Sequence, residues 1–267
     1  MTGMLPAPSS VAVVVPAKNE AARIAQTVRA AASLPAVDLV VVVDDGSGDA
    51  TTACAQETEA IVVRHGRNRG KAAAMQTGAG AVGTIDQHER RTNDPRALLF
   101  LDADLADTAG GVAPLLRPVL DGVADMSIAT LPPQRMSGGG HGFVVRLARN
   151  GIEQATGWSP VQPLSGQRCL TRPAFDAALP LAAGFGVEVG LTIDLLRTGY
   201  RVREVEVELQ HRVTGTDVAG QLHRGRQWAH VARALLRRGA APIRRRSASS
   251  FSSEQVPGAR PPHGPER

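Results

Sequence analysis

The chain has 267 residues, of which 43% are hydrophobic, so it can bury the core of one large α/β domain or of two small ones. No apolar run approaches the roughly 20 residues of a membrane helix, and residues 1–10 lack the basic start and apolar stretch of a signal peptide, so we expect a cytoplasmic protein. The net charge is +5, but much of the excess arginine comes late in the chain, without aromatic residues that could stack on bases, which argues against a nucleic-acid partner.

Strands and helices alternate through the first hundred residues. Unbroken apolar runs, typical of buried strands, lie at residues 11–15, 39–43, 60–63 and 98–101. Helices are predicted to begin near Glu20, Asp49 and Gly70. This alternation predicts an α/β fold with a mostly parallel central sheet flanked by helices. Ligands of such sheets bind beyond the carboxyl ends of the strands, where this chain carries its polar motifs.

The second half of the chain is expected to complete the same layered domain. Two stretches are predicted to be loops, the charged residues 83–96 and the glycine-rich residues 132–142. Helices are expected at residues 143–155, 191–196 and 218–238, and a half-exposed strand at residues 201–209. Cys54 and Cys169 match no metal or redox spacing, and we expect both to be free thiols.

The first candidate motif is Asp102-Ala103-Asp104, directly after the predicted strand at residues 98–101. Two carboxylates at positions i and i+2 can point into one site once the chain turns. Mg²⁺ and Mn²⁺ prefer oxygen ligands and bridge carboxylates to phosphates. Acidic pairs also cap helices and decorate turns, but the position after a buried strand favours a metal site.

Three further motifs follow predicted strands. Pro16-Ala17-Lys18-Asn19-Glu20 either caps a helix through Asn19 or wraps a nucleoside. In Asp44-Asp45-Gly46-Ser47, Gly46 permits a tight turn, and a carboxylate can accept from a base N–H or a ribose hydroxyl. Asn68-Arg69-Gly70-Lys71 is either a basic surface turn or a source of backbone N–H groups and a cation for phosphate. Each motif alone is a common turn, but their joint order is not common.

In this order the four motifs resemble family 2-like glycosyltransferases of the GT-A (Rossmann-like) fold, over about residues 11–130. Later segments narrow the resemblance to glucosyl-3-phosphoglycerate synthases, over roughly residues 11–230. These segments are Gly138-Gly139-Gly140, Val161-Gln162-Pro163-Leu164-Ser165-Gly166, Gly186-Val187-Glu188 and Gln210-His211-Arg212. The domain organisation that we predict has a flexible N-terminus (1–10), a glycosyltransferase domain (11–240) with a nucleotide-binding half (11–130) and an acceptor-binding half (131–240), and a disordered, basic, proline-rich tail (241–267).

The resemblance also implies which residues bind the donor nucleotide and the metal. The nucleotide-binding residues would be Pro16, Ala17, Glu20, Asp45, Lys71, Asp102 and Ala103. Mg²⁺ or Mn²⁺ would bind Asp104 and His211. The catalytic residues would be Asp102, Asp104 and Glu188, with Glu188 facing the donor sugar. The synthases usually carry Ser at the position of Asp45, so this chain departs from them there.

The resemblance implies an acceptor pocket at Ser165, Gly166 and Arg168, because the synthases build that pocket from the corresponding segment. The planar guanidinium of Arg168 suits a carboxylate or a phosphate, and Arg172 is a second candidate for this contact. The chain carries Val213 where the synthases carry an Asn among the groups that hold the acceptor. We therefore expect a small anionic acceptor and leave 3-phosphoglycerate itself open.

Together these features predict a metal-dependent glycosyltransferase that moves a sugar to this acceptor. The expected sugar is glucose, and the expected donor is UDP-glucose. A polyprenyl-phosphate glycosyltransferase is the main alternative, because the basic helix at residues 218–238 could lie on an anionic membrane. A non-catalytic nucleotide-binding domain is a second alternative. A peripheral membrane contact, a homodimer and the choice between retention and inversion stay open. An inverting enzyme would need a base, for which Glu188 and Asp194 are the candidates.

Overall fold

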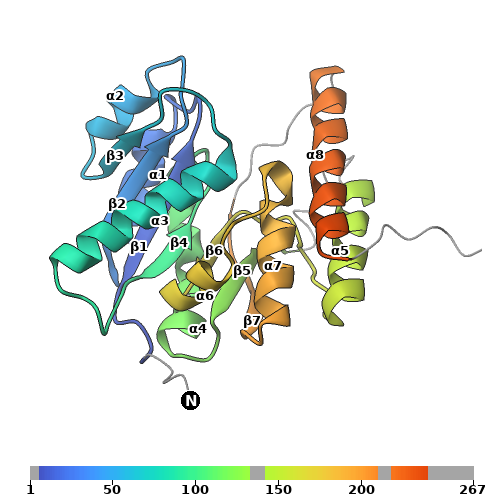
Figure 1. The fold of residues 1–267 in the computed structure, drawn as a ribbon. Helices are drawn as coiled ribbons and strands as arrows, with labels where there is room; N and C mark the ends of the chain where they lie inside the picture. The colour runs from blue at the N-terminus through green and yellow to red at the C-terminus, as the bar shows by residue number, and fades with distance from the viewer. Residues whose placement is uncertain (1–5, 133–141, 210–217, 240–267) are drawn as a thin grey trace, which may run out of the picture.

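The computed structural model describes residues 6–132, 142–209 and 218–239 (Figure 1). Its centre is a seven-stranded sheet with the strand order β3-β2-β1-β4-β6-β5-β7. The strands are β1 (Val11–Ala17), β2 (Val37–Asp44), β3 (Ile61–Arg64), β4 (Ala97–Phe100), β5 (Met126–Thr130), β6 (Arg168–Leu170) and β7 (Val202–Glu206). Strand β6 runs antiparallel to both of its neighbours, and the other pairs are parallel. The predicted α/β fold with a mostly parallel sheet is confirmed.

Helices cover both faces of the sheet, as Figure 1 shows. The apolar run of β1 explains why, because successive strand residues point to opposite faces. Val11, Val13 and Val15 belong to one core, while Ala12 and Val14 belong to the other. The first core contains side chains of α1 (Ile24–Ala32), α2 (Thr51–Gln56), η1 (Ala106–Leu115) and α4 (Leu116–Leu120). The second contains side chains of α3 (Lys71–His88), α6 (Arg172–Ala177) and α7 (Val187–Arg197).

Helix α3 lies very close to the sheet because its inner face is made of small residues. A Cβ atom added at Gly78 would stand 2.3 Å from Cγ1 of Val14 and 3.2 Å from Cγ2 of Val43. Contacts this short require backbone movement, so only glycine fits at this crossing. The close packing fixes the height of α3, and therefore of Lys71 at its first turn, above the sheet.

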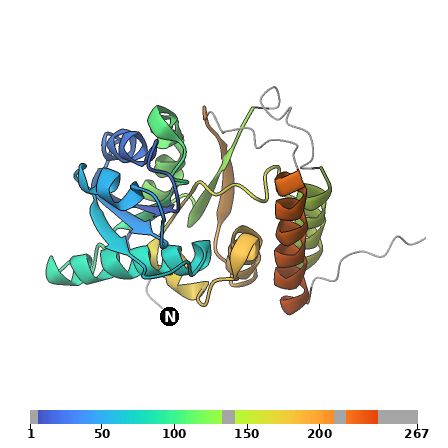
Figure 2. The same ribbon diagram turned by 90° about the horizontal axis from the view of Figure 1, so that it is seen from above.

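A further layer lies outside α7, as Figure 2 shows. Helices α5 (Gly142–Thr156) and α8 (Val218–Arg237) share with α7 a third apolar core, which includes Ile152, Ile193 and Leu235. The short helix η3 (Gly184–Gly186) joins this group through its contacts with α8. Helix α7 therefore contacts the sheet on one side and the α5–α8 pair on the other. Every helix within the described ranges is too short or too polar to cross a bilayer.

The structure corrects several local predictions. Helix α3 continues to His88, so residues 83–88 are helical and not part of a loop. Helix α1 begins at Ile24, and Asn19 does not cap it, because the Asn19 side chain accepts a hydrogen bond from the backbone N–H of Gly48 at 2.9 Å. Strands β5 and β6 were not predicted from the sequence. The predicted loop around Gly138-Gly139-Gly140 and the tail at residues 241–267 lie outside the described residues.

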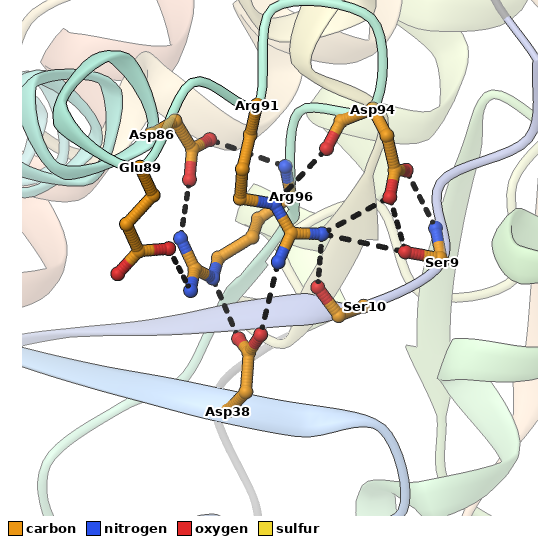
Figure 3. A network of polar contacts seen from close by, with 8 residues as sticks. All are labelled: Ser9, Ser10, Asp38, Asp86, Glu89, Arg91, Asp94 and Arg96. Carbon is orange, nitrogen blue, oxygen red and sulfur yellow. Dashed lines mark hydrogen bonds and ion pairs between the residues drawn. The ribbon is translucent and has the colours of Figure 1, made fainter.

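The edge where the strands begin carries a network of ionic contacts (Figure 3). The buried guanidinium of Arg96 contacts carboxylate oxygens of Asp38 at 2.6 Å, Asp86 at 2.5 Å and Glu89 at 2.7 Å. Beside it, Arg91 contacts Asp38 and Asp94, each at 3.2 Å. The network also includes Ser9 and Ser10. We call these eight residues the strand-start network. It ties the beginnings of β1, β2 and β4 to the end of α3.

Candidate active site

The candidate site lies at the opposite edge, where the parallel strands end. Strand β4 ends at Phe100 and leads directly to Asp102. Because β6 is antiparallel to β4, it begins at this same edge, and Arg168 pairs with Phe100. The residue before it, Gln167, therefore comes beside Asp102. A strand of only three residues thus brings the second half of the chain to the acidic motif of the first half.

Four side chains form a hydrogen-bonded group that we call the Lys71 cluster. Lys71 Nζ lies 2.7 Å from Oδ1 of Asp102 and 3.0 Å from Oε1 of Glu188. Gln167 Nε2 donates to Oδ2 of Asp102 at 2.7 Å. Lys71 stands at the first turn of α3 and Glu188 at the first turn of α7. The cluster therefore joins two helices and two strand ends around one ammonium group.

The charges of the cluster favour a bound cation. Burial alone would lower the pKa of Lys71, but the charges of Asp102 and Glu188 outweigh it and raise that pKa above its ordinary value. Lys71 is therefore an ammonium at neutral pH. One ammonium faces two carboxylates here, and Asp104 adds a third two residues after Asp102. An excess of carboxylate charge at a strand-end edge is the environment that a divalent cation prefers.

Asp104 is the acidic residue best suited to hold such a cation. It is partly exposed, and no hydrogen bond or ion pair joins its carboxylate to another described residue. Its two oxygens are hard donors of the kind that Mg²⁺ and Mn²⁺ take. The described residues hold no group of three or more His, Cys, Asp or Glu side chains arranged for a metal. The residues present therefore fit a cation that takes few protein ligands and completes its shell with phosphate and water. His211 lies outside the described residues.

The other predicted nucleotide residues share this edge. Pro16 and Ala17 end β1, and the Ala17 carbonyl accepts from the backbone N–H of Asp45 at 2.8 Å. The backbone N–H of Glu20 donates to Thr51 Oγ1 at 2.8 Å, and the Glu20 side chain is partly exposed. Ala103 is buried, and its carbonyl accepts from Thr27 Oγ1 at 2.9 Å. The loops after β1, β2 and β4 thus meet around one edge.

Asp45 is more enclosed than a direct nucleoside contact requires. Its Oδ1 accepts from the backbone N–H of Arg69 at 2.8 Å, and it also lies 2.7 Å from His65 Nδ1. Its Oδ2 accepts from the backbone N–H of Gly70 at 2.7 Å. Burial would raise the pKa of Asp45, but these hydrogen bonds outweigh it and lower that pKa. Asp45 is therefore ionised and bound to the segment that precedes α3.

Of the predicted acceptor residues, the structure brings Gly166 and Ser165 to the Lys71 cluster. A Cβ atom at Gly166 would stand 2.7 Å from both Lys71 Nζ and Asp102 Oδ2. The backbone therefore passes directly against the two charged groups, and a side chain at this position would displace them. Ser165 is partly exposed beside it, and its hydroxyl donates to Gln167 Oε1 at 3.4 Å.

Arg168 differs from the prediction. Arg168 is 1% exposed, and each of its three guanidinium nitrogens donates to a protein acceptor. The acceptors are the carbonyls of Pro163, Ser165 and Glu188 and the hydroxyl of Thr192. Burial lowers the pKa of Arg168 to about 10, so the group stays charged at neutral pH. Arg168 therefore supports the Pro163–Gly166 segment from behind and is not free to contact an acceptor.

Arg172 differs as well. It opens α6, beyond the far end of β6, and so belongs to the edge where the parallel strands begin. Its guanidinium contacts Asp176 at 2.9 Å and the carbonyl of Ala79 at 2.9 Å. The prediction that Arg172 could bind the acceptor is therefore wrong.

Two residues of the site had no predicted role. Gln167 directly follows the recognised segment at residues 161–166, and only the antiparallel pairing of β6 shows that its amide meets Asp102. His65 follows β3 and contacts Asp45, and nothing local in the sequence distinguishes it from a surface histidine. A signal for either would require knowing which strands are neighbours.

The comparisons with known proteins agree with this geometry. The model of the family "Glycosyl transferase family 2" matches residues 12–144. The chain is a glycosyltransferase, and its residues 12–144 are similar to family 2 members. A curated relative, Glycosyltransferase AglJ from Haloferax volcanii, is 27% identical over 80% of this chain and 67% of its own length.

Solved structures of one enzyme extend the likeness of this glycosyltransferase beyond the matched domain. Glucosyl-3-phosphoglycerate synthase from Mycobacterium tuberculosis with Mg²⁺ and UDP has a TM-score of 0.70 and 26% identity. The same enzyme with Mn²⁺, UDP-glucose and phosphoglyceric acid has a TM-score of 0.68 and 28% identity. Each of these two matches covers 88% of this chain and 81% of the synthase chain. The predicted resemblance, fold and enzyme class are confirmed.

Proposed function

We propose that this glycosyltransferase moves glucose from UDP-glucose to a small anionic acceptor with the help of Mg²⁺ or Mn²⁺. The observation that carries the proposal is the Lys71 cluster at the strand-end edge, together with the nearby carboxylate of Asp104, which has no partner among the described residues. The synthase of known structure, which binds UDP-glucose, Mn²⁺ and phosphoglyceric acid, supports the same choice of donor, metal and acceptor class.

The donor side follows from the chemistry of these groups. Pro16, Ala17 and Glu20 would line the uridine, and Asp104, with His211, would hold the metal. The metal supplies positive charge that offsets the developing charge of the departing diphosphate. Lys71 adds a fixed ammonium to the same oxygens. Glu188 stands 3.0 Å from that ammonium, so its carboxylate can accept from a hydroxyl of the sugar next to the diphosphate.

The acceptor side would be formed by Ser165 and Gly166, beside the Lys71 cluster. The missing Cβ of Gly166 lets this segment lie directly against Lys71 and Asp102. An acceptor bound along the segment would therefore lie close to the sugar that Glu188 orients. Arg168 would act indirectly, because its hydrogen bonds hold the carbonyls of Pro163 and Ser165. We propose a phosphorylated hydroxy acid as the acceptor, because the solved synthase binds phosphoglyceric acid. The position of Val213 lies outside the described residues.

Transfer to a polyprenyl phosphate is a second candidate. The observation in its favour is an exposed face near the end of α8, where Trp228 and Leu236 stand among exposed arginines. Tryptophan, leucine and arginine on one helical face suit an anionic membrane surface. This candidate keeps the same donor site and changes only the acceptor.

A cytoplasmic location and a homodimer also remain predictions.

One screen distinguishes these proposals. UDP-glucose and GDP-glucose would each be offered with 3-phosphoglycerate, with related phosphorylated acids and with a short polyprenyl phosphate, in Mn²⁺, Mg²⁺ or chelator. We expect a glucosylated acid from UDP-glucose only when metal is present. Product on the polyprenyl phosphate alone would establish the second candidate. Preference for GDP-glucose would overturn the base assignment.

A further inference from the structure

We propose that Asp45 and His65 are positioning residues that set the place of Lys71, rather than direct ligands of the nucleoside. The inference deepens the proposed function and rests on the role given there to Lys71 at the diphosphate. Both residues lie at strand ends, Asp45 after β2 and His65 after β3, and both are buried, at 5% and 6% exposure. Neither is one of the four members of the Lys71 cluster.

The hydrogen bonds of Asp45 lead to the residue before Lys71. The backbone N–H groups of Arg69 and Gly70 donate to different oxygens of the same carboxylate, at 2.8 Å and 2.7 Å. Gly70 is the last residue before α3 and has a φ of +89°, which favours glycine. Two consecutive N–H groups held by one carboxylate fix the direction in which the chain enters the helix. Lys71 is the next residue, so its side chain leaves from a fixed point.

His65 holds that carboxylate in turn. An ionised carboxylate only accepts hydrogen bonds, so His65 Nδ1 carries the proton of its 2.7 Å contact with Asp45. His65 Nε2 lies 2.9 Å from Thr77 Oγ1 on α3. The imidazole therefore links Asp45, which holds the two residues before α3, to Thr77 within that helix. This bridge holds Asp45 in the one orientation that reaches both Arg69 and Gly70.

The backbone of the neighbouring turn supports the same segment. Gly46 follows Asp45 and has a φ of +69°. A Cβ atom at Gly46 would stand 2.6 Å from the carbonyl carbon of Arg67 and 2.8 Å from the backbone nitrogen of Asn68. The turn after β2 is thus pressed against the chain that leads into α3. Three donors already meet the Asp45 carboxylate, which favours a positioning role over a direct contact with the base.

A double-mutant cycle tests this inference. The affinity for UDP and for uridine, each with Mn²⁺, would be measured in the full chain and in the variants Asp45→Asn, His65→Leu, Lys71→Ala and Asp45→Asn/Lys71→Ala. We expect Asp45→Asn and His65→Leu each to weaken UDP binding about tenfold. Uridine lacks the diphosphate, so its affinity should not change. In the Lys71→Ala background, Asp45→Asn should cause no further loss, because residues that act through one another are not additive.

Conservative and control variants distinguish a positioning role from a general loss of stability. His65→Asn keeps a donor toward Asp45 and should restore most of the UDP affinity that His65→Leu loses. Asp86→Asn removes a comparably buried carboxylate from the strand-start network, so it should lower the melting temperature and leave both affinities unchanged. If Asp45→Asn does not fold, the His65 pair carries the test alone, with the same cycle against Lys71→Ala.

Two results would overturn the inference, and they differ. If Asp45→Asn weakens uridine as much as UDP, and its effect adds to that of Lys71→Ala, then Asp45 contacts the nucleoside directly and the proposed function stands. If Lys71→Ala alone leaves UDP affinity unchanged, then Lys71 does not meet the diphosphate. That second result removes part of the proposed function together with the inference.

Discussion

The two edges of the central sheet carry ionic groups of opposite design. At the strand-start edge, Arg96 contacts three carboxylates, and the neighbouring Asp94 receives hydrogen bonds from Ser9 and contacts Arg91. At the strand-end edge, Lys71 contacts two carboxylates, while Asp104 has no partner among the described residues. The first group is complete within the protein. The second leaves negative charge for something that binds, which separates a stabilising network from a site.

The largest effect that we predict breaks the strand-start network. Arg96→Met would leave Asp86 buried without its charged partner, and breaking a buried ion pair from one side costs about 3–5 kcal/mol. The free energy of unfolding from urea denaturation measures this loss, and kcat of the folded enzyme should stay near that of the wild type. Arg117→Met is the matched control, because Arg117 and Asp121 form an exposed pair. Equal losses in the two variants would contradict the predicted difference.

The next effect should separate activity from stability. Asp104→Ala should lower kcat about 10²- to 10³-fold, because one stabiliser of the leaving group is lost. The melting temperature should hardly change, since no described residue depends on this carboxylate. Turnover measured against Mn²⁺ concentration, with differential scanning calorimetry on the same samples, checks both statements. Normal turnover of the variant in chelator would refute the metal role.

A smaller effect tests the close approach at Gly166. Gly166→Ala places a methyl group where 2.7 Å separates it from Lys71 Nζ and from Asp102 Oδ2, so both side chains must move. Displacement of about 1 Å at a catalytic group costs up to about 10²-fold in rate. Both contacted atoms are ends of flexible side chains, so the fold should persist. We expect kcat/KM to fall with little change in the melting temperature. Gly80→Ala, in open space on α3, is the control.

The smallest effect concerns pH and the strand-start network. Burial would raise the pKa of Asp94, but hydrogen bonds from Ser9 and the charge of Arg91 outweigh it and lower that pKa. Its contribution to stability is therefore complete above the unfolded value, near pH 4, and is lost as pH falls through the lower folded value. Asp94 is partly exposed, so the contribution is a few tenths of a kcal/mol. Urea denaturation at pH 5 and at pH 3 should show a smaller acid loss for Asp94→Asn than for the wild type.

The sequence predicted the first half of the fold well because local signals suffice there. The runs that became β1, β2 and β4 are apolar on both faces, and the polar motifs follow them directly. Lys71, Asp102 and Glu188 were all named as candidates, and the structure brings them together. Their roles in binding and catalysis remain predictions.

What could not be predicted depends on contacts between distant segments. Strand β6 has three residues, too few for a periodic signal, yet its pairing brings Gln167 to Asp102. The guanidinium of Arg168 suits an anion by its chemistry, and only the packing reveals that protein carbonyls already use it. The charged stretch after α3 reads as a solvated loop because its acidic partner Asp38 lies far away in the sequence.

The shortness of β6 limits how this enzyme can change during evolution. Its side chains alternate, so that Cys169 belongs to one core and Leu170 to the other. An insertion or deletion within β6 would shift the register by one residue and turn the charge of Arg168 toward the opposite, apolar core. Such length changes would therefore destabilise the domain. Divergence toward new acceptors would therefore proceed in this strand by substitution.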